Sequence, residues 1–349
     1  MIRTARTLCV TALAAGALLA TPMATSAAPA PAGAATPALA APRADGPIPG
    51  AIRVGTFNIA KSTIGYRGFT WAVRRGALVN VVAAARPDVL AIQEANTQVW
   101  RGVRHIDDVV NLLGSVGYRI ASTDVDACNP GCTRGAHIFF NPDRMSLATL
   151  PNPRMPAAGM TGQSNVAGTW LPGVQERAVS WAFLTPRGST RTTLYVSVHM
   201  PTQQHGTGEA LRVAIANRLL PWASELVARS ALPQADLVIA GDFNSFDRRQ
   251  PQGAQQVLRA AGLLDGWLAP EKVNANYSTV NTTPKTRKYK GFPPGPYFYK
   301  RDTTRIDYIF STATPLRHEV FLRLTGDGKF DNAFRASDHN LVMVDLPLA

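Results

Sequence analysis

The sequence has 349 residues, of which 36 are Lys or Arg and 23 are Asp or Glu, giving a formal net charge of +13 at pH 7. A basic surface attracts polyanions such as nucleic acid, anionic lipid or cell-wall phosphate, although charge alone does not indicate a reaction. Beyond an N-terminal leader no stretch is apolar enough to cross a bilayer, which excludes a membrane-spanning domain.

The N-terminus is typical of a secretory signal peptide over residues 1–27. Two arginines and no acid accompany an apolar stretch at residues 8–20, and small residues follow up to Ala27. The apolar stretch is too short for a membrane span. We therefore expect a secreted, monomeric protein without stable membrane insertion. Cleavage removes the two arginines and lowers the net charge from +13 to +11.

The mature chain begins with residues 28–50, which are mostly Ala and Pro. Such a composition cannot bury a core, so we expect a disordered lead-in. Residues 51–349 are enough for one double-layered domain and show no second linker or internal repeat. Within them, Cys128 and Cys132 flank an Asn-Pro-Gly turn, which favours a small disulfide loop in an oxidising compartment. A metal-binding pair is the alternative, but no second pair of soft ligands completes a zinc site.

Two β-rich stretches near the start of this domain end in polar side chains. Residues 52–59 alternate as a strand and carry Asn58 at the far end. A helix is predicted at residues 69–85, because apolar residues recur there at helical spacing and a proline follows. Residues 88–94 then form a buried strand that ends in Glu94. In a β-α-β unit the two strands are parallel, so Glu94 should emerge at the same edge as Asn58.

The middle of the chain alternates between helical and extended patterns. Apolar residues at helical spacing predict helices at residues 98–114 and 206–230, with Pro221 as a kink in the second. Between them, a run of short β segments indicates a meander and therefore a mixed or antiparallel sheet. These segments are residues 119–122, 136–140, 145–150, 177–184 and 192–199. His199 ends the last one, a position where a single His is more often structural than catalytic.

A continuous apolar run at residues 237–240 predicts a strand that is buried on both faces and ends at Gly241. Asp242 and Asn244 follow as exposed residues. In extended backbone their spacing places an acceptor and a donor on one face at the mouth of the sheet. A turn at a strand end is the commoner meaning of such residues. A short helix is predicted near residues 253–261.

Residues 271–305 combine eight basic with six aromatic side chains. Basic residues neutralise phosphates and aromatic rings stack on unpaired bases, so this segment is a candidate nucleic-acid surface. The alternative is a Pro-rich loop whose aromatic rings pack on the protein body.

Two C-terminal stretches also join polar residues to strands. Asp307 lies near the start of the stretch 305–310, and Asp338 and His339 directly precede the stretch 340–345. A carboxylate beside an imidazole suits an orienting Asp and a proton-transferring His. Such pairs arise by chance, but here they accompany several other polar strand ends.

Six short motifs together resemble those of the metal-dependent endonuclease/exonuclease/phosphatase superfamily, which includes pancreatic-type deoxyribonucleases, abasic-site endonucleases, neutral sphingomyelinases and inositol-polyphosphate 5-phosphatases. The resemblance covers about residues 52–346. It implies an α/β fold, a four-layer α/β sandwich in which two mixed β-sheets pack face to face with helices outside and the active site at one edge. The motifs are Thr-Phe-Asn58, Ile-Gln-Glu94, Ser-Val-His199, Gly-Asp-Phe-Asn244, Arg-Ile-Asp307 and Ser-Asp-His339.

The resemblance also implies how the site binds metal and substrate. Glu94 would be the principal ligand of a divalent cation, with Asn58 and Asp338 beside it. Magnesium is expected, with manganese or calcium as substitutes. Asp242 would position or deprotonate the attacking water, and Asn244 would hold a phosphate oxygen.

The resemblance implies roles for four further side chains. His339, oriented by Asp307, would be the general base or the stabiliser of the phosphorane. His199 would meet the phosphate or the leaving group, and Arg177 would contact phosphate. Residues 132–135 depart from the pancreatic-type pattern, which has a Tyr and a Glu there, so the partner of His199 can differ.

These implications predict a secreted metal-dependent phosphodiesterase, most simply a nuclease acting on DNA and/or RNA. The alternative is a phosphoesterase of the same fold that acts on phospholipid or small phosphorylated compounds, although the long apolar hairpin of bacterial sphingomyelinases is missing. A non-catalytic binding module is a third possibility, disfavoured because every site position is filled.

Overall fold

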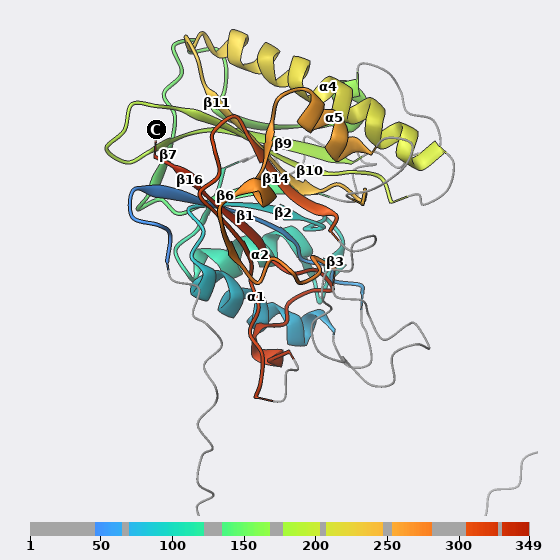
Figure 1. Cartoon of the computed structure of the whole chain (residues 1–349). Coiled ribbons are helices and arrows are strands. Elements are labelled where there is room, and N and C mark those ends of the chain that lie inside the picture. Colours follow the sequence, from blue (N-terminus) through green and yellow to red (C-terminus); the bar gives the residue numbers. More distant parts are fainter. Residues whose placement is uncertain are drawn as a thin grey trace, which may run out of the picture. The chain divides into compact units, whose positions relative to one another are not determined.

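Two large mixed β-sheets pack face to face, with helices on both outer sides (Figure 1). This computed structural model describes residues 46–64, 70–121, 135–167, 177–202, 207–246, 253–280, 305–326 and 330–348. They all fall within one compact unit, Ala38–Ala349; the other unit, Met1–Pro37, lies outside the described residues. The architecture is the four-layer α/β sandwich predicted from the sequence.

The first sheet has seven strands. Strands β1 and β2 are parallel, as are β13 and β15, and the other neighbours are antiparallel. The order across the sheet is β13 (Glu271–Val273), β15 (Arg317–Val320), β16 (Val342–Pro347), β1 (Ala51–Asn58), β2 (Val89–Gln93), β6 (Ala136–Phe140) and β5 (Arg119–Ile120).

The second sheet has one parallel pair, β10 with β11, among antiparallel neighbours. Its order is β12 (Leu264–Asp265), β14 (Asp307–Ser311), β11 (Asp236–Asp242), β10 (Thr193–His199), β9 (Ala178–Pro186) and β7 (Met145–Leu147), and β8 (Ala158–Gly162) pairs with β9 off this path. The segments predicted as one meander are divided between the two sheets, with β5 and β6 in the first and β7, β9 and β10 in the second. Both sheets are mixed, as the sequence predicted.

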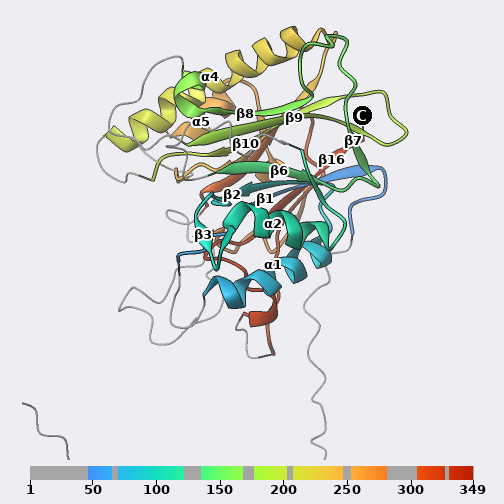
Figure 2. The same ribbon diagram turned by 180° about the vertical axis from the view of Figure 1, so that it is seen from behind.

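Helices cover the outer faces of both sheets, as the two opposite views show (Figures 1 and 2). On the first sheet lie α1 (Trp71–Ala85) and α2 (His105–Gly114), and on the second lie α3 (Gln163–Ala167), α4 (Thr207–Ser230) and α5 (Ala254–Ala260). Pro221 lies inside α4. Single 3-10 turns are η1 (Gly266–Leu268) and η2 (Asn332–Phe334). None of the described helices combines the length and apolar character needed to span a bilayer.

Side chains that alternate across the strands fill three apolar layers. In β2, Val89 and Ala91 face the space between the sheets, whereas Leu90 and Ile92 pack with α1 and α2. Successive side chains of a strand point to opposite faces. A strand covered on both faces is therefore apolar throughout, which explains the continuous apolar runs in the sequence.

The prediction of a single helix over residues 98–114 is wrong for its first part. A hairpin of β3 (Val99–Trp100) and β4 (Val103–Arg104) comes first, and α2 begins only at His105. Arg101 and Gly102 have φ of 48° and 82°, as a two-residue type I′ turn requires. The two valines of the hairpin mimic helical spacing, but they are largely exposed.

The prediction that Asp242 is an exposed residue beyond its strand is also wrong. Asp242 is the last residue of β11 and is 1% exposed, because it pairs with both β10 and β14. A buried carboxylate needs polar partners, and Asn58 Nδ2 donates to Asp242 Oδ2 (3.0 Å).

The folded part of the chain begins by Gly46, a few residues before the predicted start at residue 51. The carbonyl of Gly46 accepts a hydrogen bond from Arg53 Nη2 (3.0 Å), and Ile48 N donates to Asp345 Oδ2 (3.2 Å). Cys128 and Cys132 lie outside the described residues, so their disulfide stays a prediction.

Candidate active site

Polar side chains from both sheets meet at one edge of the sandwich. In the second sheet, the register places His199 beside Asp242 and Asp242 beside Asp307, on the adjacent strands β10, β11 and β14. In the first sheet, Asn58 ends β1 and Glu94 directly follows β2. The parallel pairs β1–β2 and β10–β11 thus bring their carboxyl ends to the same edge, as the parallel-sheet rule predicts.

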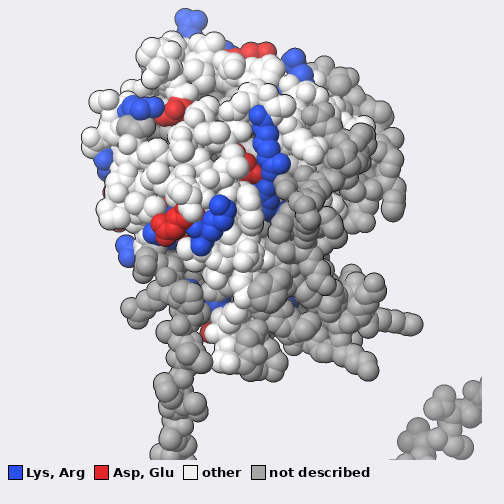
Figure 3. Space-filling view, viewed as in Figure 1, with Lys and Arg blue, Asp and Glu red and all other residues white. Residues whose placement is uncertain are grey.

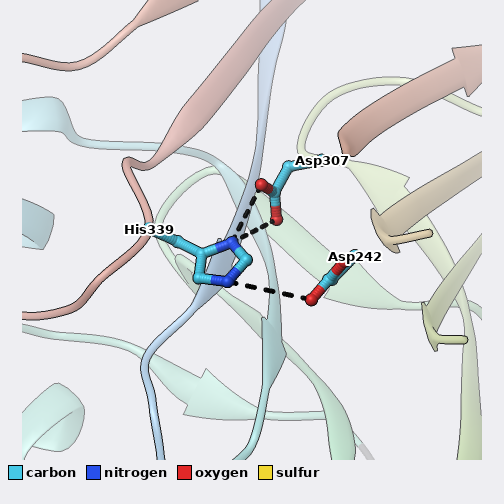
Figure 4. Close-up of side chains that lie close together, drawn as sticks. All are labelled: Asp242, Asp307 and His339. Atoms are coloured by element: carbon cyan, nitrogen blue, oxygen red, sulfur yellow. Dashed lines mark hydrogen bonds and ion pairs between the residues drawn. The ribbon is translucent and has the colours of Figure 1, made fainter. Parts of the chain in front are cut away.

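His339 and Asp307 form a hydrogen-bonded pair (Figure 4). His339 Nδ1 lies 2.9 Å from Oδ2 and 3.1 Å from Oδ1 of Asp307. Thr279 Oγ1 accepts the main-chain N–H of Asp307 (3.3 Å), and Ser337 Oγ accepts that of His339 (3.2 Å). Burial alone would lower the pKa of His339, but the charge of Asp307 and this hydrogen bond raise it well above its ordinary value. The Asp307 carboxylate thus favours the charged form of the imidazole.

Asp242 lies between the two histidines. Its Oδ2 accepts a hydrogen bond from Asn58 Nδ2 (3.0 Å) and lies 3.4 Å from His199 Nε2 and 3.9 Å from His339 Nε2. Burial, and next the charge of Asp307, raise the pKa of Asp242 to about 7 against the opposing effects of His339 and two hydrogen bonds. A carboxyl group with a pKa near neutrality can hold a water molecule and accept its proton.

Glu94 projects from a strained turn. Its φ is 69°, a left-handed conformation that is uncommon outside glycine and that concentrates at functional sites. Lys61 N donates to Glu94 Oε2 (3.0 Å), while Oε1 lies 3.5 Å from Asn58 Nδ2 and 4.0 Å from His199 Nε2. Asn58 Oδ1 accepts the N–H of Ala60 (3.0 Å), so the amide NH2 of Asn58 faces the carboxylates of the site.

Two predicted substrate contacts have main-chain partners in the structure. Arg177 is 2% exposed, and its guanidinium donates to the carbonyls of His199 and Met200. Asn244 Nδ2 donates to the same Met200 carbonyl (3.0 Å). Both side chains thereby fix the backbone at the end of β10. Their contacts with a substrate phosphate stay predictions.

Asp338 lies beside His339 in the loop before β16. Its Oδ1 lies 3.2 Å from Ser337 Oγ, and its charge is among the effects that raise the pKa of His339. Ser337 Oγ donates its proton to the carbonyl of Asn58 (2.6 Å), which ties this loop to the end of β1. The role of Asp338 as a metal ligand stays a prediction.

The site has the donor chemistry that a hard divalent cation prefers. Asp242 and Asp307 offer carboxylate oxygens, which lie within 4.8 Å of each other and of a ring nitrogen of His339. Glu94 adds a further carboxylate at the same edge. Buried carboxylates at this spacing repel each other, which contributes to the raised pKa of Asp242, and a bound cation would relieve that repulsion. The residues present therefore fit a metal ion.

A model of the Endonuclease/Exonuclease/phosphatase family matches residues 55–339, a span that includes every predicted site residue from Asn58 to His339. The chain belongs to this family. Its members hydrolyse phosphoester bonds and usually use divalent metal ions. No curated protein sequence matches the chain at a significant level.

Solved structures of the endonuclease/exonuclease/phosphatase family share the fold. A family protein from Bacteroides thetaiotaomicron is 20% identical over 85% of this chain and 97% of its own, with a TM-score of 0.60. A mannosyl-6-phosphatase from the same organism is 18% identical over 84% and 99%, with a TM-score of 0.59. The human Nocturnin catalytic domain, solved with a bound sulfate anion, is 20% identical over 84% and 92%, with a TM-score of 0.53. At these identities the likeness shows the fold alone.

An ion-pair cluster beside the site escaped prediction from the sequence. Arg305 donates to both carboxylate oxygens of Asp265 (2.9 and 2.7 Å), and Arg259 Nε donates to Asp265 Oδ2 (3.1 Å). Arg305 lies two residues before Asp307 and stacks on the ring of Tyr308 at 4.5 Å. The cluster therefore anchors the segment that leads into β14. Asp265 precedes a glycine in the sequence, which is typical of an ordinary turn.

Replacing Asp265 with Asn is expected to lower the free energy of unfolding at pH 7 by about 3–5 kcal/mol, because it leaves buried Arg305 without its carboxylate. Burial opposes ionisation of Asp265, but Arg305 and Arg259 hold its pKa well below the usual range. The contribution of this carboxylate is therefore present above the unfolded pKa of about 4 and declines as the pH falls below it. Urea unfolding should show the difference between wild type and variant shrinking from pH 7 to pH 3; a constant difference would contradict the assignment.

Proposed function

We propose that the protein is a metal-dependent phosphodiesterase whose substrate is DNA and/or RNA. One observation carries the proposal: five polar side chains meet at one edge of the sandwich, in a family whose members hydrolyse phosphoesters. They are Glu94, His199, Asp242, Asp307 and His339. Such a set supplies a carboxylate for water, a cation for developing charge and acidic ligands for a metal.

The side chains divide the chemistry between them. Asp242, with its raised pKa, holds the attacking water and accepts its proton. His339, in the charged form that Asp307 favours, would stabilise the negative charge that develops on the phosphoryl oxygens, while Asp307 fixes its orientation. Glu94 would hold Mg²⁺, with Mn²⁺ or Ca²⁺ as substitutes. The bound cation supplies Lewis-acid neutralisation of the phosphate charge.

Two features of the sequence support nucleic acid as the substrate: the net charge of +11 that remains without residues 1–27, and the basic, aromatic segment 271–305. Most of that segment, residues 281–304, lies outside the described residues. On the face in Figure 3, the described Lys and Arg side chains are scattered, and several have an acidic neighbour. We therefore expect the basic side chains of the segment 271–305 to contribute more to nucleic-acid binding than those of this face.

A second candidate is a phosphoesterase that acts on small phosphorylated compounds or phospholipid. The structural similarity to a mannosyl-6-phosphatase favours it, because that protein has the same fold with a small-molecule substrate. The catalytic edge serves either substrate, and the loops around it decide between them. We further propose that the protein is secreted, on the basis of the signal-peptide pattern at residues 1–27, and that it acts as a monomer.

Purified protein is expected to cleave plasmid DNA, single-stranded DNA or RNA in the presence of Mg²⁺, and EDTA should abolish this cleavage. Bis(p-nitrophenyl) phosphate serves as a generic phosphodiester, and p-nitrophenyl phosphate as the matched monoester. Release of phosphate from the monoester or from a sugar phosphate, with all nucleic acids intact, would contradict the nuclease proposal and support the second candidate.

A further inference from the structure

Arg74 is a buried arginine in α1, directly behind the catalytic edge. It is 1% exposed, and its guanidinium lies 5.3 Å from the ring centroid of Trp71. A buried guanidinium has to place its five N–H donors on acceptors, because the desolvation cost is otherwise large. Its Nη1 and Nη2 atoms donate to main-chain carbonyls of two loops at this edge.

The first loop follows β1 and carries Asn58. Arg74 Nη1 donates to the carbonyl of Ile59 (2.7 Å), and Nη2 donates to that of Lys61 (2.9 Å). The N–H of Lys61 in turn donates to Glu94 Oε2 (3.0 Å). The main chain of Lys61 therefore links Arg74 to Glu94, because its carbonyl accepts from the guanidinium and its N–H donates to the carboxylate.

The second loop precedes β16 and carries His339. Arg74 Nη1 donates to the carbonyl of Ala336 (2.9 Å), 262 residues away in the sequence. The next residue, Ser337, bonds the carbonyl of Asn58 (2.6 Å) and the N–H of His339 (3.2 Å). The same guanidinium thus holds the loop of His339 against the loop that supports Glu94.

We propose that Arg74 is a positioning residue that sets the spacing between Glu94 and the His339–Asp307 pair. The inference rests on the proposed function, since that spacing matters only if both groups act on one phosphodiester. Arginine suits the task because its planar fork reaches several carbonyls at once, whereas an ammonium is a point donor. Displacement of a catalytic group by about 1 Å can cost on the order of 100-fold in rate.

Arg53 provides a matched control at the opposite end of β1. It is also 1% exposed, and it pairs with Asp345 (2.8 Å) and approaches Glu319 (3.7 Å). Asp345 lies opposite Arg53 in the register of β1 and β16, and Glu319 lies on β15, whereas Asn58 is at the other end of β1. Arg53→Lys, in a strand, and Arg74→Lys, in helix α1, make the same chemical change at two buried positions, and both keep the positive charge.

The test compares Arg74→Lys, Arg53→Lys and wild type for kcat and KM on bis(p-nitrophenyl) phosphate and for the rise in Tm on addition of Mg²⁺. We expect Arg74→Lys to lower kcat by about 10- to 100-fold with KM little changed. It should also raise the Mg²⁺ concentration needed for half of the Tm rise by about tenfold. Arg53→Lys should lower Tm without changing kcat or the Mg²⁺ response.

If Arg74→Lys lowers Tm yet keeps the wild-type kcat and Mg²⁺ response, Arg74 is merely structural and the inference fails. If wild type cleaves no phosphodiester but its Tm rises with Mg²⁺, the proposed function fails. The shift in the Mg²⁺ concentration needed by Arg74→Lys then still tests whether Arg74 positions Glu94. A wild-type protein that neither cleaves nor responds to Mg²⁺ overturns both.

Discussion

Replacing His339 with Gln is expected to lower kcat for phosphodiester hydrolysis by about 10²- to 10⁴-fold. Gln keeps a polar group of similar size but cannot carry the positive charge that Asp307 stabilises on the imidazole. Because this charge acts on the developing phosphorane, the loss should fall on kcat more than on KM. Initial rates on bis(p-nitrophenyl) phosphate at saturating Mg²⁺ measure the effect.

His318→Gln is the matched control for this variant. His318 is also buried, but it lies in β15 against Trp267, and its strand partner Val344 is five residues beyond His339. The control should lose stability without losing kcat. An equal fall in kcat for both variants, or none for His339→Gln, would contradict the catalytic assignment.

Replacing Glu94 with Gln is expected to remove the response to Mg²⁺ and to lower kcat/KM by about 10³-fold, equivalent to about 4 kcal/mol. The exchange is nearly isosteric and removes only the negative charge that faces Asn58 and His199. Both the Mg²⁺-dependent rise in Tm and the rate should therefore fall together. Calorimetric titration with Mg²⁺ gives an independent measurement of binding.

Glu225→Gln controls for the loss of one acidic charge, since Glu225 is an exposed residue of α4. It should behave as wild type in every assay. Wild-type Mg²⁺ affinity in Glu94→Gln would exclude Glu94 as the principal ligand and would move the metal toward Asp242, Asp307 and His339.

Much of the fold is predictable from the sequence because strand patterns specify it. The stretch 136–140 coincides with β6, and the apolar run at residues 237–240 lies inside β11. Both strands are covered on both faces, so their environment selects apolar residues throughout. The hairpin at residues 99–104 was missed because Val99 and Val103 have helical spacing. The adjacent Arg101-Gly102 was the available signal for a type I′ turn.

The candidate site is predictable because several of its residues lie at the ends of strands, as Asn58, His199 and Asp242 do. Parallel strands bring their carboxyl ends together, so the strand pattern alone is enough to place Asn58 and Glu94 at one edge. The supporting residues lack such a signal. Arg74 occupies one position of an amphipathic helix, where an arginine usually faces solvent, and its carbonyl partners come from loops far apart in the sequence. Long-range contacts of this kind depend on how the loops fold back.

The Mg²⁺ dependence of phosphodiester hydrolysis in wild type and His339→Gln tests the central claim most directly. Protein stripped with EDTA should be inactive on bis(p-nitrophenyl) phosphate. Its rate should rise to saturation as Mg²⁺ is added, and His339→Gln should stay at least about 100-fold slower at every concentration. Equal rates for the two proteins, or a wild-type rate that is independent of divalent metal, would contradict the assignment of this edge as a metal-dependent phosphodiesterase site.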